Sequence, residues 1–156
     1  MLILATFNTL SFYNNQKAFL MPAKPHTVVL ADDDPDDIAV FQETVKTLCP
    51  AVKLLVAEDG KKLLQLLEGN KLPNLIVLDI NMPVINGLDT LKNIRKNARY
   101  DKVPVMMYTS SKNKEEMNEC IKNGADYYAV KSSNYRDISN LINGICRGIW
   151  NSRFSI

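Results

Sequence analysis

The sequence predicts a single α/β domain, in which helices cover both faces of a doubly wound, five-stranded parallel sheet. Short apolar runs alternate five times with segments of helical periodicity, and this alternation is typical of a parallel sheet. Residues 75–78 are four consecutive apolar residues, as expected for a central strand that is buried on both faces. At 156 residues, 46% of them hydrophobic, the chain is long enough to bury one core of this kind.

Each predicted element is bounded by turn or capping residues. The predicted strands are 27–31, 52–56, 75–78, 103–108 and 127–130, and the predicted helices are 35–48, 60–69, 88–98, 113–122 and 135–150. Asp34 before Pro35 fits an N-cap followed by proline at the first helical position. Asn113 and Glu116 have the spacing of a capping box. The pair at 86–87, Asn-Gly, is predicted to be a turn.

Residues 1–25 are predicted to be an extension and linker, and residues 26–156 the folded domain. The extension has neither the basic start and cleavage site of a signal peptide nor the apolar length of a membrane span. The net charge of +2 favours neither nucleic acid nor a membrane as a partner. The three cysteines form no disulfide or zinc-binding pattern, so they are predicted to be buried thiols of a cytoplasmic protein: Cys49, Cys120 and Cys146.

Polar side chains stand where four of the five predicted strands end. They are Asp32, Asp33, Asp79, Thr109, Ser110 and Lys131. If the first and third strands are neighbours, as in the flavodoxin-like order 2-1-3-4-5, the three carboxylates converge at the edge where ligands bind. Two carboxylates about 4 Å apart repel by about 4 kcal/mol at an effective dielectric constant of about 20. Mg²⁺ suits such a site, because it prefers oxygen ligands and retains several waters.

The same residue types suit phosphoryl transfer. A carboxylate such as that of Asp79 can act as a nucleophile and accept a phosphoryl group as an acyl phosphate. The transfer depends mainly on positioning and on neutralisation of charge, which the metal, a lysine and a hydroxyl group would supply. No histidine base is required, because an aspartate is already ionised at neutral pH.

Residues 28–149 resemble the receiver domain of bacterial two-component response regulators, particularly those that consist of a receiver alone. The matching motifs are Asp32-Asp33, Asp79-x-Asn-Met-Pro followed by Gly87, Thr109-Ser110, and Lys131 after a strand that contains an aromatic residue. This combination is far more specific than any one of its parts. The resemblance implies a cytoplasmic phosphoacceptor in a two-component phosphorelay, which catalyses only its own phosphorylation and dephosphorylation.

By this resemblance, Asp79 is the phosphoacceptor. Asp33 and Asp79 would bind Mg²⁺ directly, together with the backbone carbonyl of Asn81. Asp32 would bind the ion through water.

The resemblance also implies a switch. Thr109 would bond a phosphoryl oxygen and move on activation, Lys131 would pair with the phosphoryl group, and Tyr128 would change between outward and inward rotamers. The family usually has a proline in a cis peptide after the lysine, where this chain has Ser132. A cis bond costs about 2.5–4 kcal/mol before serine, against about 0.5–1 kcal/mol before proline. The sequence leaves open whether this bond is cis; a trans bond would place Lys131 slightly differently.

The implied partners are a histidine kinase or histidine phosphotransfer protein, and a downstream protein that the sequence does not identify. The predicted output surface is the face from Asn113 to Trp150, which would also serve a homodimer. Trp150 and Phe154 are its predicted apolar anchors. The segment has no basic stripe, so nucleic acid is not a predicted partner.

Two other functions are compatible with parts of the pattern. A phosphorylation-independent, receiver-like interaction module would normally lack the acidic pair or the lysine, and this chain retains Asp32, Asp33 and Lys131. A phosphatase of the haloacid-dehalogenase type would need a second acid two residues after its nucleophile, where this chain has Asn81. Taken singly, each of these polar residues has a simpler explanation: the acidic residues as helix caps or turn residues, and the lysine as a solvated side chain. Only their occurrence together favours a functional site.

Overall fold

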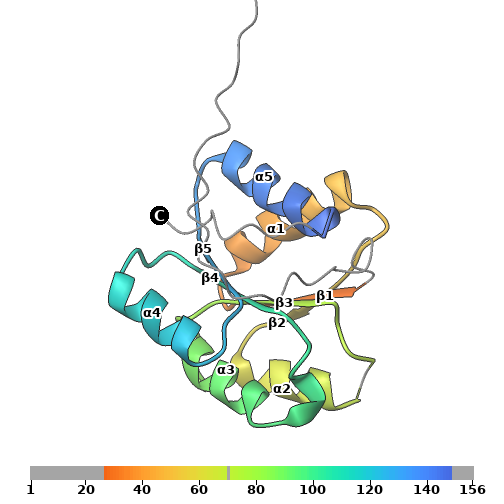
Figure 1. The fold of residues 1–156 in the computed structure, drawn as a ribbon. Helices are drawn as coiled ribbons and strands as arrows, with labels where there is room; N and C mark the ends of the chain where they lie inside the picture. The colour runs from red at the N-terminus through yellow and green to blue at the C-terminus, as the bar shows by residue number, and fades with distance from the viewer. Residues whose placement is uncertain (1–26, 70, 149–156) are drawn as a thin grey trace, which may run out of the picture.

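The computed structural model describes residues 27–69 and 71–148. Its strands form one parallel sheet in the predicted order, β2-β1-β3-β4-β5 (Figure 1). The strands are β1 (Thr27–Ala31), β2 (Lys53–Ala57), β3 (Leu75–Leu78), β4 (Val105–Thr109) and β5 (Tyr127–Val130). Ala31 pairs with Leu78, so β1 and β3 end side by side.

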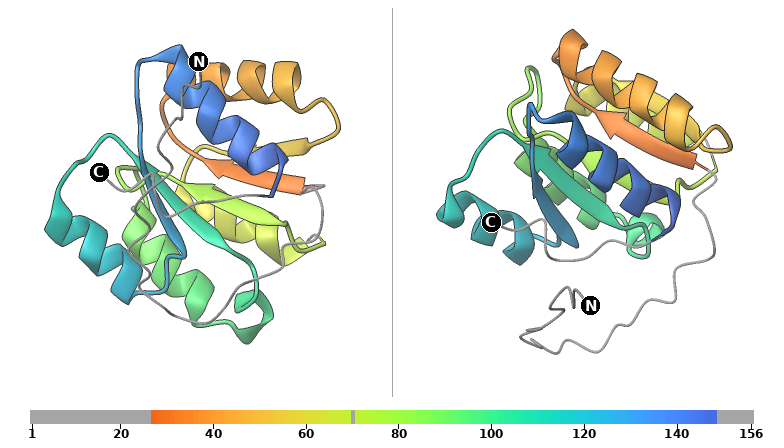
Figure 2. Two further views of the ribbon diagram at one scale, coloured as in Figure 1. Left: turned by 45° about the horizontal axis from the view of Figure 1, so that its top comes forward. Right: turned by 90° about the horizontal axis from the view of Figure 1, so that it is seen from above.

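Within the described residues, five α-helices and one short 3-10 helix alternate with the strands, and the last helix follows β5. They are α1 (Pro35–Leu48), α2 (Gly60–Gly69), α3 (Gly87–Arg95), η1 (Ala98–Tyr100), α4 (Lys114–Lys122) and α5 (Tyr135–Cys146). Helices α1 and α5 lie side by side on one face of the sheet, and α2, α3 and α4 cover the other (Figure 1, Figure 2). Among these described helices, none is long and apolar enough to cross a membrane.

Strand β3 contributes to both halves of the core, because successive residues of a strand point to opposite faces. Ile76 and Leu78 pack with the apolar side chains of α2 and α3. Leu75 and Val77 pack with those of α1 and α5. All four side chains are fully buried, and burial of each contributes about 1.5–3 kcal/mol to stability. The prediction of a central strand buried on both faces is confirmed.

The predicted ends of several elements are wrong. The strand predicted over residues 52–56 is β2, one residue later at both ends. The helix predicted over residues 88–98 ends at Arg95, and η1 follows it. Strand β4 begins at Val105, because Pro104 has no amide hydrogen for the ladder. The helix predicted to reach Trp150 ends at Cys146, because Gly148 adopts a left-handed φ of 65° that ends the last turn. Trp150 and Phe154 lie outside the described residues.

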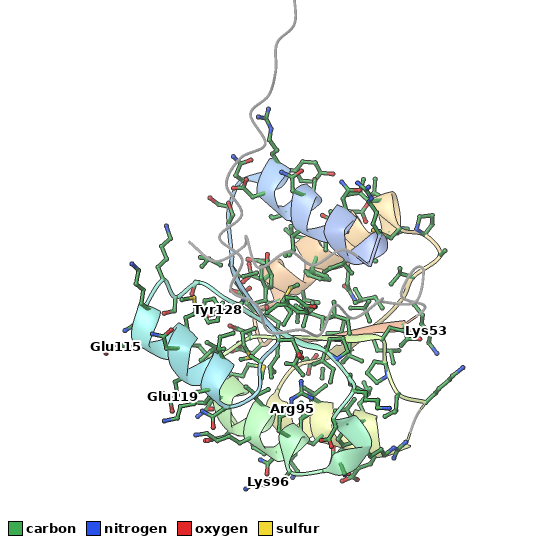
Figure 3. The ribbon with its side chains drawn as sticks, in the orientation of Figure 1. Lys53, Arg95, Lys96, Glu115, Glu119 and Tyr128 are labelled. Atoms are coloured by element: carbon green, nitrogen blue, oxygen red, sulfur yellow. A yellow bond between two sulfur atoms is a disulfide. The ribbon has the colours of Figure 1, made fainter. Side chains whose placement is uncertain are left out.

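Arg95 is the last residue of α3, and its side chain anchors that end of the helix. Its guanidinium donates hydrogen bonds to the backbone carbonyls of Tyr100, Val103 and Gly124, each at about 3 Å, and pairs with Asp126 at 2.9 Å. The side chain thereby ties the end of α3 to the segments that enter β4 and β5. Figure 3 shows Arg95 on the face of the sheet that α2 and α3 cover.

The helix starts follow the capping predictions in part. Oδ1 of Asp34 accepts hydrogen bonds from the amides of Asp36 (2.9 Å) and Asp37 (3.4 Å), so the predicted N-cap of α1 is confirmed. The pair at 86–87 is not a free turn. Asn86 instead caps α3, because its Oδ1 accepts a hydrogen bond from the amide of Asp89 (2.8 Å).

The predicted capping box of α4 is half right. Oδ1 of Asn113 accepts hydrogen bonds from the amides of Glu115 (2.8 Å) and Glu116 (3.2 Å), as an N-cap does. The carboxylate of Glu116 does not return to Asn113. It lies 3.1 Å from the hydroxyl of Tyr128 on β5.

The prediction of three thiols is wrong for two cysteines. Cys49 caps the end of α1 and is joined by a disulfide to Cys146 at the end of α5, with Cα atoms 5.8 Å apart. The packing of α1 against α5 brings these residues together across 97 positions of sequence, and spacing alone gives no sign of that packing. Cys120 is a buried thiol, as predicted, and burial raises its pKa to about 11.

Candidate functional site

Backbone hydrogen bonds fix the strand ends that carry the site. The amide of Asp79 donates to the carbonyl of Ala31 (2.9 Å), and the amide of Asp32 donates to the last residue of β2 (3.0 Å). The amide of Lys131 donates to the carbonyl of Thr109 (2.7 Å). The parallel pairing therefore continues one residue past the strands and brings these polar residues to one edge of the sheet.

The structure brings Asp32, Asp33 and Asp79 together at this edge. One carboxylate oxygen from each lies within 4.8 Å of the other two. Asp32 and Asp79 are buried, whereas Asp33 is exposed. Oδ1 of Asp32 accepts a hydrogen bond from the amide of Asp34 (3.1 Å), but its buried Oδ2 accepts none among the described residues. This donor set fits a divalent cation that retains water on the exposed side.

Lys131 places its ammonium among these carboxylates. Nζ donates hydrogen bonds to Oδ2 of Asp79 (3.2 Å) and to Oδ2 of Asp37 (2.8 Å). It also lies 2.8 Å from Oδ2 of Asp32, in an ion pair that lacks the direction of a hydrogen bond. The Lys131 side chain is only 13% exposed, so water screens these charges weakly. One cation therefore faces three carboxylates.

The pKa values at the site reflect burial as well as charge. Burial raises the pKa of Asp79; the positive charge of Lys131 offsets part of this rise and the negative charge of Asp32 adds to it. Burial likewise raises the pKa of Asp32 against the opposing effect of Lys131. Burial alone would lower the pKa of Lys131, but its carboxylate partners outweigh burial and raise it. A bound cation would stabilise both buried carboxylates in their charged form.

The backbone around Asp79 is tightly packed. Oδ1 of Asp79 accepts a hydrogen bond from the amide of Ile80 (2.7 Å), so each carboxylate oxygen has a donor. The amide of Gly87 donates to the carbonyl of Ile80 (2.8 Å). A Cβ at position 87 would overlap the carbonyl oxygen of Asp79 and would lie 2.7 Å from Cα of Ile80. Gly87 therefore lets the start of α3 close against the phosphoacceptor candidate.

Asn81 lies two residues after Asp79, in the loop between β3 and α3, and its side chain is exposed. The amides of Met82 and Gly87 both donate to the carbonyl of Ile80, so the loop turns back directly after the strand. Val84 lies in this loop with a φ of 68°, which a β-branched residue rarely adopts. The loop beside the site is therefore strained at Val84, a residue that is 75% exposed.

Thr109 and Tyr128, the predicted switch residues, are both buried and share one neighbour. Oγ1 of Thr109 accepts a hydrogen bond from the amide of Ser111 (3.3 Å). The hydroxyl of Tyr128 lies 3.2 Å from the carbonyl of Ser111 and 3.1 Å from the carboxylate of Glu116. Figure 3 shows Tyr128 between the sheet and α4. Ser111 and Glu116 thus connect the end of β4, strand β5 and helix α4.

The loop after Lys131 leads into α5. The Lys131–Ser132 peptide bond is trans, since the described residues contain no cis peptide. Oγ of Ser132 donates to the carboxylate of Asp137 (2.8 Å) and accepts from the amide of Asn134 (3.1 Å). Ser132 therefore begins the turn into α5.

Sequence analysis missed the partners of two site residues: Asp37 beside Lys131, and the Ser111–Glu116 pair beside Tyr128. Asp37 is one of the acidic residues in the first turn of α1, where such a charge ordinarily stabilises the helix N-terminus. It lies 94 residues from Lys131, and no pattern in the sequence connects the two.

A family model of the response regulator receiver domain matches residues 28–143. The chain therefore belongs to the response regulator receiver domain family. Response regulator Rcp1 of Synechocystis is 29% identical over 127 residues, which cover 78% of this chain and 86% of that protein. Chemotaxis protein CheY1 of Helicobacter pylori is 30% identical over 99 residues, which cover 62% of this chain and 80% of that protein.

Solved structures agree with this assignment. The Mn²⁺-bound form of response regulator Rcp1 superposes with a TM-score of 0.70 at 29% identity, covering 78% of this chain and 91% of that one. The phosphorylated cyanobacterial phytochrome response regulator RcpA has a TM-score of 0.71 at 23% identity and supports the fold alone. The chain is thus a receiver domain of two-component signalling. Such domains interact with histidine kinases or phosphotransfer proteins and are generally not enzymes.

The contact between Gly87 and Asp79 generates a prediction. Gly87→Ala should lower the free energy of unfolding by about 2 kcal/mol or more, because the added methyl group must displace the backbone of Asp79. Gly69→Ala is the matched control: it meets no atom within 4 Å and should be neutral or stabilising by up to about 1 kcal/mol. Urea denaturation measures both. Equal effects of the two substitutions would contradict the close approach at Gly87.

Proposed function

We propose that this chain is a response regulator whose Asp79 accepts a phosphoryl group from a histidine kinase or a histidine phosphotransfer protein. The observation that carries the proposal is the position of Oδ2 of Asp79, 3.2 Å from Nζ of Lys131 and beside the carboxylates of Asp32 and Asp33. A nucleophile, a fixed positive charge and a set of cation ligands are the parts that phosphoryl transfer needs.

In the proposed transfer, a carboxylate oxygen of Asp79 forms a bond to phosphorus. The bond between phosphorus and the nitrogen of the donor histidine breaks, and its electron pair remains on that nitrogen. The Ile80 amide and Lys131 hold the Asp79 carboxylate in place before the donor arrives. The ammonium of Lys131 would then neutralise charge on the phosphoryl oxygens, and the hydroxyl of Thr109 would donate to one of them.

We propose Mg²⁺ as the ion of the site. Asp33, Asp79 and the backbone carbonyl of Asn81 would hold it directly, and Asp32 would hold it through water. When bound, the ion supplies positive charge opposite the phosphoryl oxygens. The convergence of three carboxylates, two of them buried, supports this assignment. The similar protein Rcp1 has a structure in an Mn²⁺-bound form.

The proposed output is a protein contact in the cytoplasm. Residues 26–156 act as the receiver, and residues 1–25 are an extension to it. A phosphoryl group would draw Thr109 toward Asp79 and disturb the Ser111 amide that now bonds its hydroxyl. Because Ser111 also contacts Tyr128, the change would reach α4 through Glu116. The face formed by α4, β5 and α5 is our proposed surface for a downstream protein or a second copy of the chain.

Asp79→Asn should abolish phosphorylation, because an amide is a far weaker nucleophile than a carboxylate. The full chain is incubated with a small phosphodonor and Mg²⁺, and its intact mass is recorded. The unaltered chain should gain one phosphoryl group and Asp79→Asn none, while Asp33→Ala should require more Mg²⁺. The control Asp101→Asn removes an exposed carboxylate at the end of η1, before β4 begins, and should behave as the unaltered chain. Unchanged phosphorylation in Asp79→Asn would refute the assignment.

A phosphoryl mimic should change hydrogen exchange in residues 109–131 and leave residues 36–70 almost unchanged, because the Ser111 connection lies between the site and α4. Tyr128→Phe keeps the ring and removes the hydroxyl that contacts Ser111 and Glu116. In that variant, the mimic should still change hydrogen exchange at residues 109–111, but its effect on hydrogen exchange in α4 should be smaller. A response confined to α1 and α2 would show that the output surface is wrong, although the chemistry would stand.

A further inference from the structure

Among the described residues, the ammonium of Lys131 has one carboxylate partner outside the acidic cluster. Of the three carboxylates around its ammonium, Asp32 and Asp79 belong to the set whose oxygens converge for a cation. Asp37 does not belong to that set. It lies in the first turn of α1, and its side chain is 45% exposed. It nevertheless accepts the shorter of the two hydrogen bonds from Nζ, 2.8 Å against 3.2 Å for Asp79.

The ammonium competes with a divalent cation for the same oxygens. A cation held by Asp32, Asp33 and Asp79 would lie next to oxygens that are now paired with Lys131, and the two positive charges would repel. The ammonium must then give up part of its contact with Asp32 and Asp79. It must also remain close to Asp79, where the phosphoryl oxygens would develop charge. Asp37 supplies a carboxylate that meets both requirements.

We infer that Asp37 is a positioning residue, which holds the ammonium of Lys131 within reach of Asp79 while Asp32 and Asp79 turn their oxygens to a divalent cation. This inference rests on the proposed function. Asp37 contacts neither the cation nor the phosphoryl group in this account and acts only through Lys131.

The surroundings of Lys131 allow such a shift. Asp37 is held by α1, since its amide donates to the N-cap Asp34 (3.4 Å). Asp37 and Lys131 line a cavity of about 410 Å³ between α1 and the start of α5, so the lysine side chain has space to change direction. The ring of Tyr108 lines the same cavity, with its centroid 5.8 Å from Nζ, and its face attracts a cation.

The test is a double-mutant cycle on the affinity for Mg²⁺, measured by calorimetric titration of the full chain at constant ionic strength. Asp37→Asn should weaken Mg²⁺ binding by about three- to tenfold, because the ammonium then stays with Asp32 and Asp79. Lys131→Met should strengthen binding, because it removes the competing cation. In the Lys131→Met background, Asp37→Asn should change the affinity by less than about twofold.

Asp36→Asn is the matched control for charge. Asp36 is the neighbouring acidic residue in the first turn of α1, is exposed, and has no ion pair with Lys131 among the described contacts. The substitution Asp36→Asn removes one negative charge, as Asp37→Asn does, and should change Mg²⁺ affinity by less than about twofold. Thermal unfolding of each variant, read before titration, verifies that it is folded.

The outcomes separate the inference from the proposed function. Equal weakening by Asp36→Asn and Asp37→Asn would mean that only long-range charge matters, and would overturn the inference. The inference would also be overturned if Asp37→Asn weakened Mg²⁺ binding as much in the Lys131→Met background as in the unaltered chain. It would be overturned as well if Asp37→Asn left the Mg²⁺ affinity of the unaltered chain unchanged, provided that the unaltered chain binds Mg²⁺ and is phosphorylated. If the unaltered chain binds no Mg²⁺ and gains no phosphoryl group, the proposed function itself fails.

Discussion

At the carboxyl edge of the sheet, the ammonium of Lys131 lies within 3.2 Å of three carboxylates, two of them buried. Without that ammonium, Asp32 and Asp79 would be buried charges within 4.8 Å of each other. Their repulsion would be about 3–4 kcal/mol at an effective dielectric constant of about 20. The ion pair therefore stabilises an arrangement that the fold otherwise makes unfavourable. One ammonium does not neutralise three carboxylates, so the site keeps a net negative charge. That charge favours the binding of a divalent cation, which in turn favours the binding of a phosphoryl group.

The sheet prevents the carboxylates from moving apart. Strand β3 is buried on both faces, and the amide of Asp79 is bonded to the end of β1, so the phosphoacceptor candidate cannot retreat from Asp32. Gly87 closes α3 against the same residue. A change in charge at Asp79 must therefore be accommodated by groups that can move. These are the lysine side chain beside its cavity and the segment around Ser111, which contacts both Thr109 and Tyr128.

The sequence predicts strand order, layers and strand-end residues well, because these depend on local periodicity and on the parallel sheet that the periodicity requires. It fails where a side chain reaches across the fold. The bond from Arg95 at the end of α3 to Gly124, the Tyr128 contact of Glu116, the Cys49–Cys146 disulfide and the Asp37 partner of Lys131 all join distant segments. In each case the local pattern already has a simpler role for the residue, such as a helix cap or an acidic first turn. Only the packing of the helices reveals the second role.

The most direct test of this account is a crystal structure of the full chain with Mg²⁺ and beryllofluoride, a mimic of the phosphoryl group. We predict that the mimic binds to Asp79, that Mg²⁺ lies among Asp33, Asp79 and the Asn81 carbonyl, and that Nζ of Lys131 contacts both the mimic and Asp37. A structure in which Lys131 is turned to solvent, or in which the mimic binds elsewhere, would contradict the central claim that one shared ammonium prepares this edge of the sheet for phosphoryl transfer.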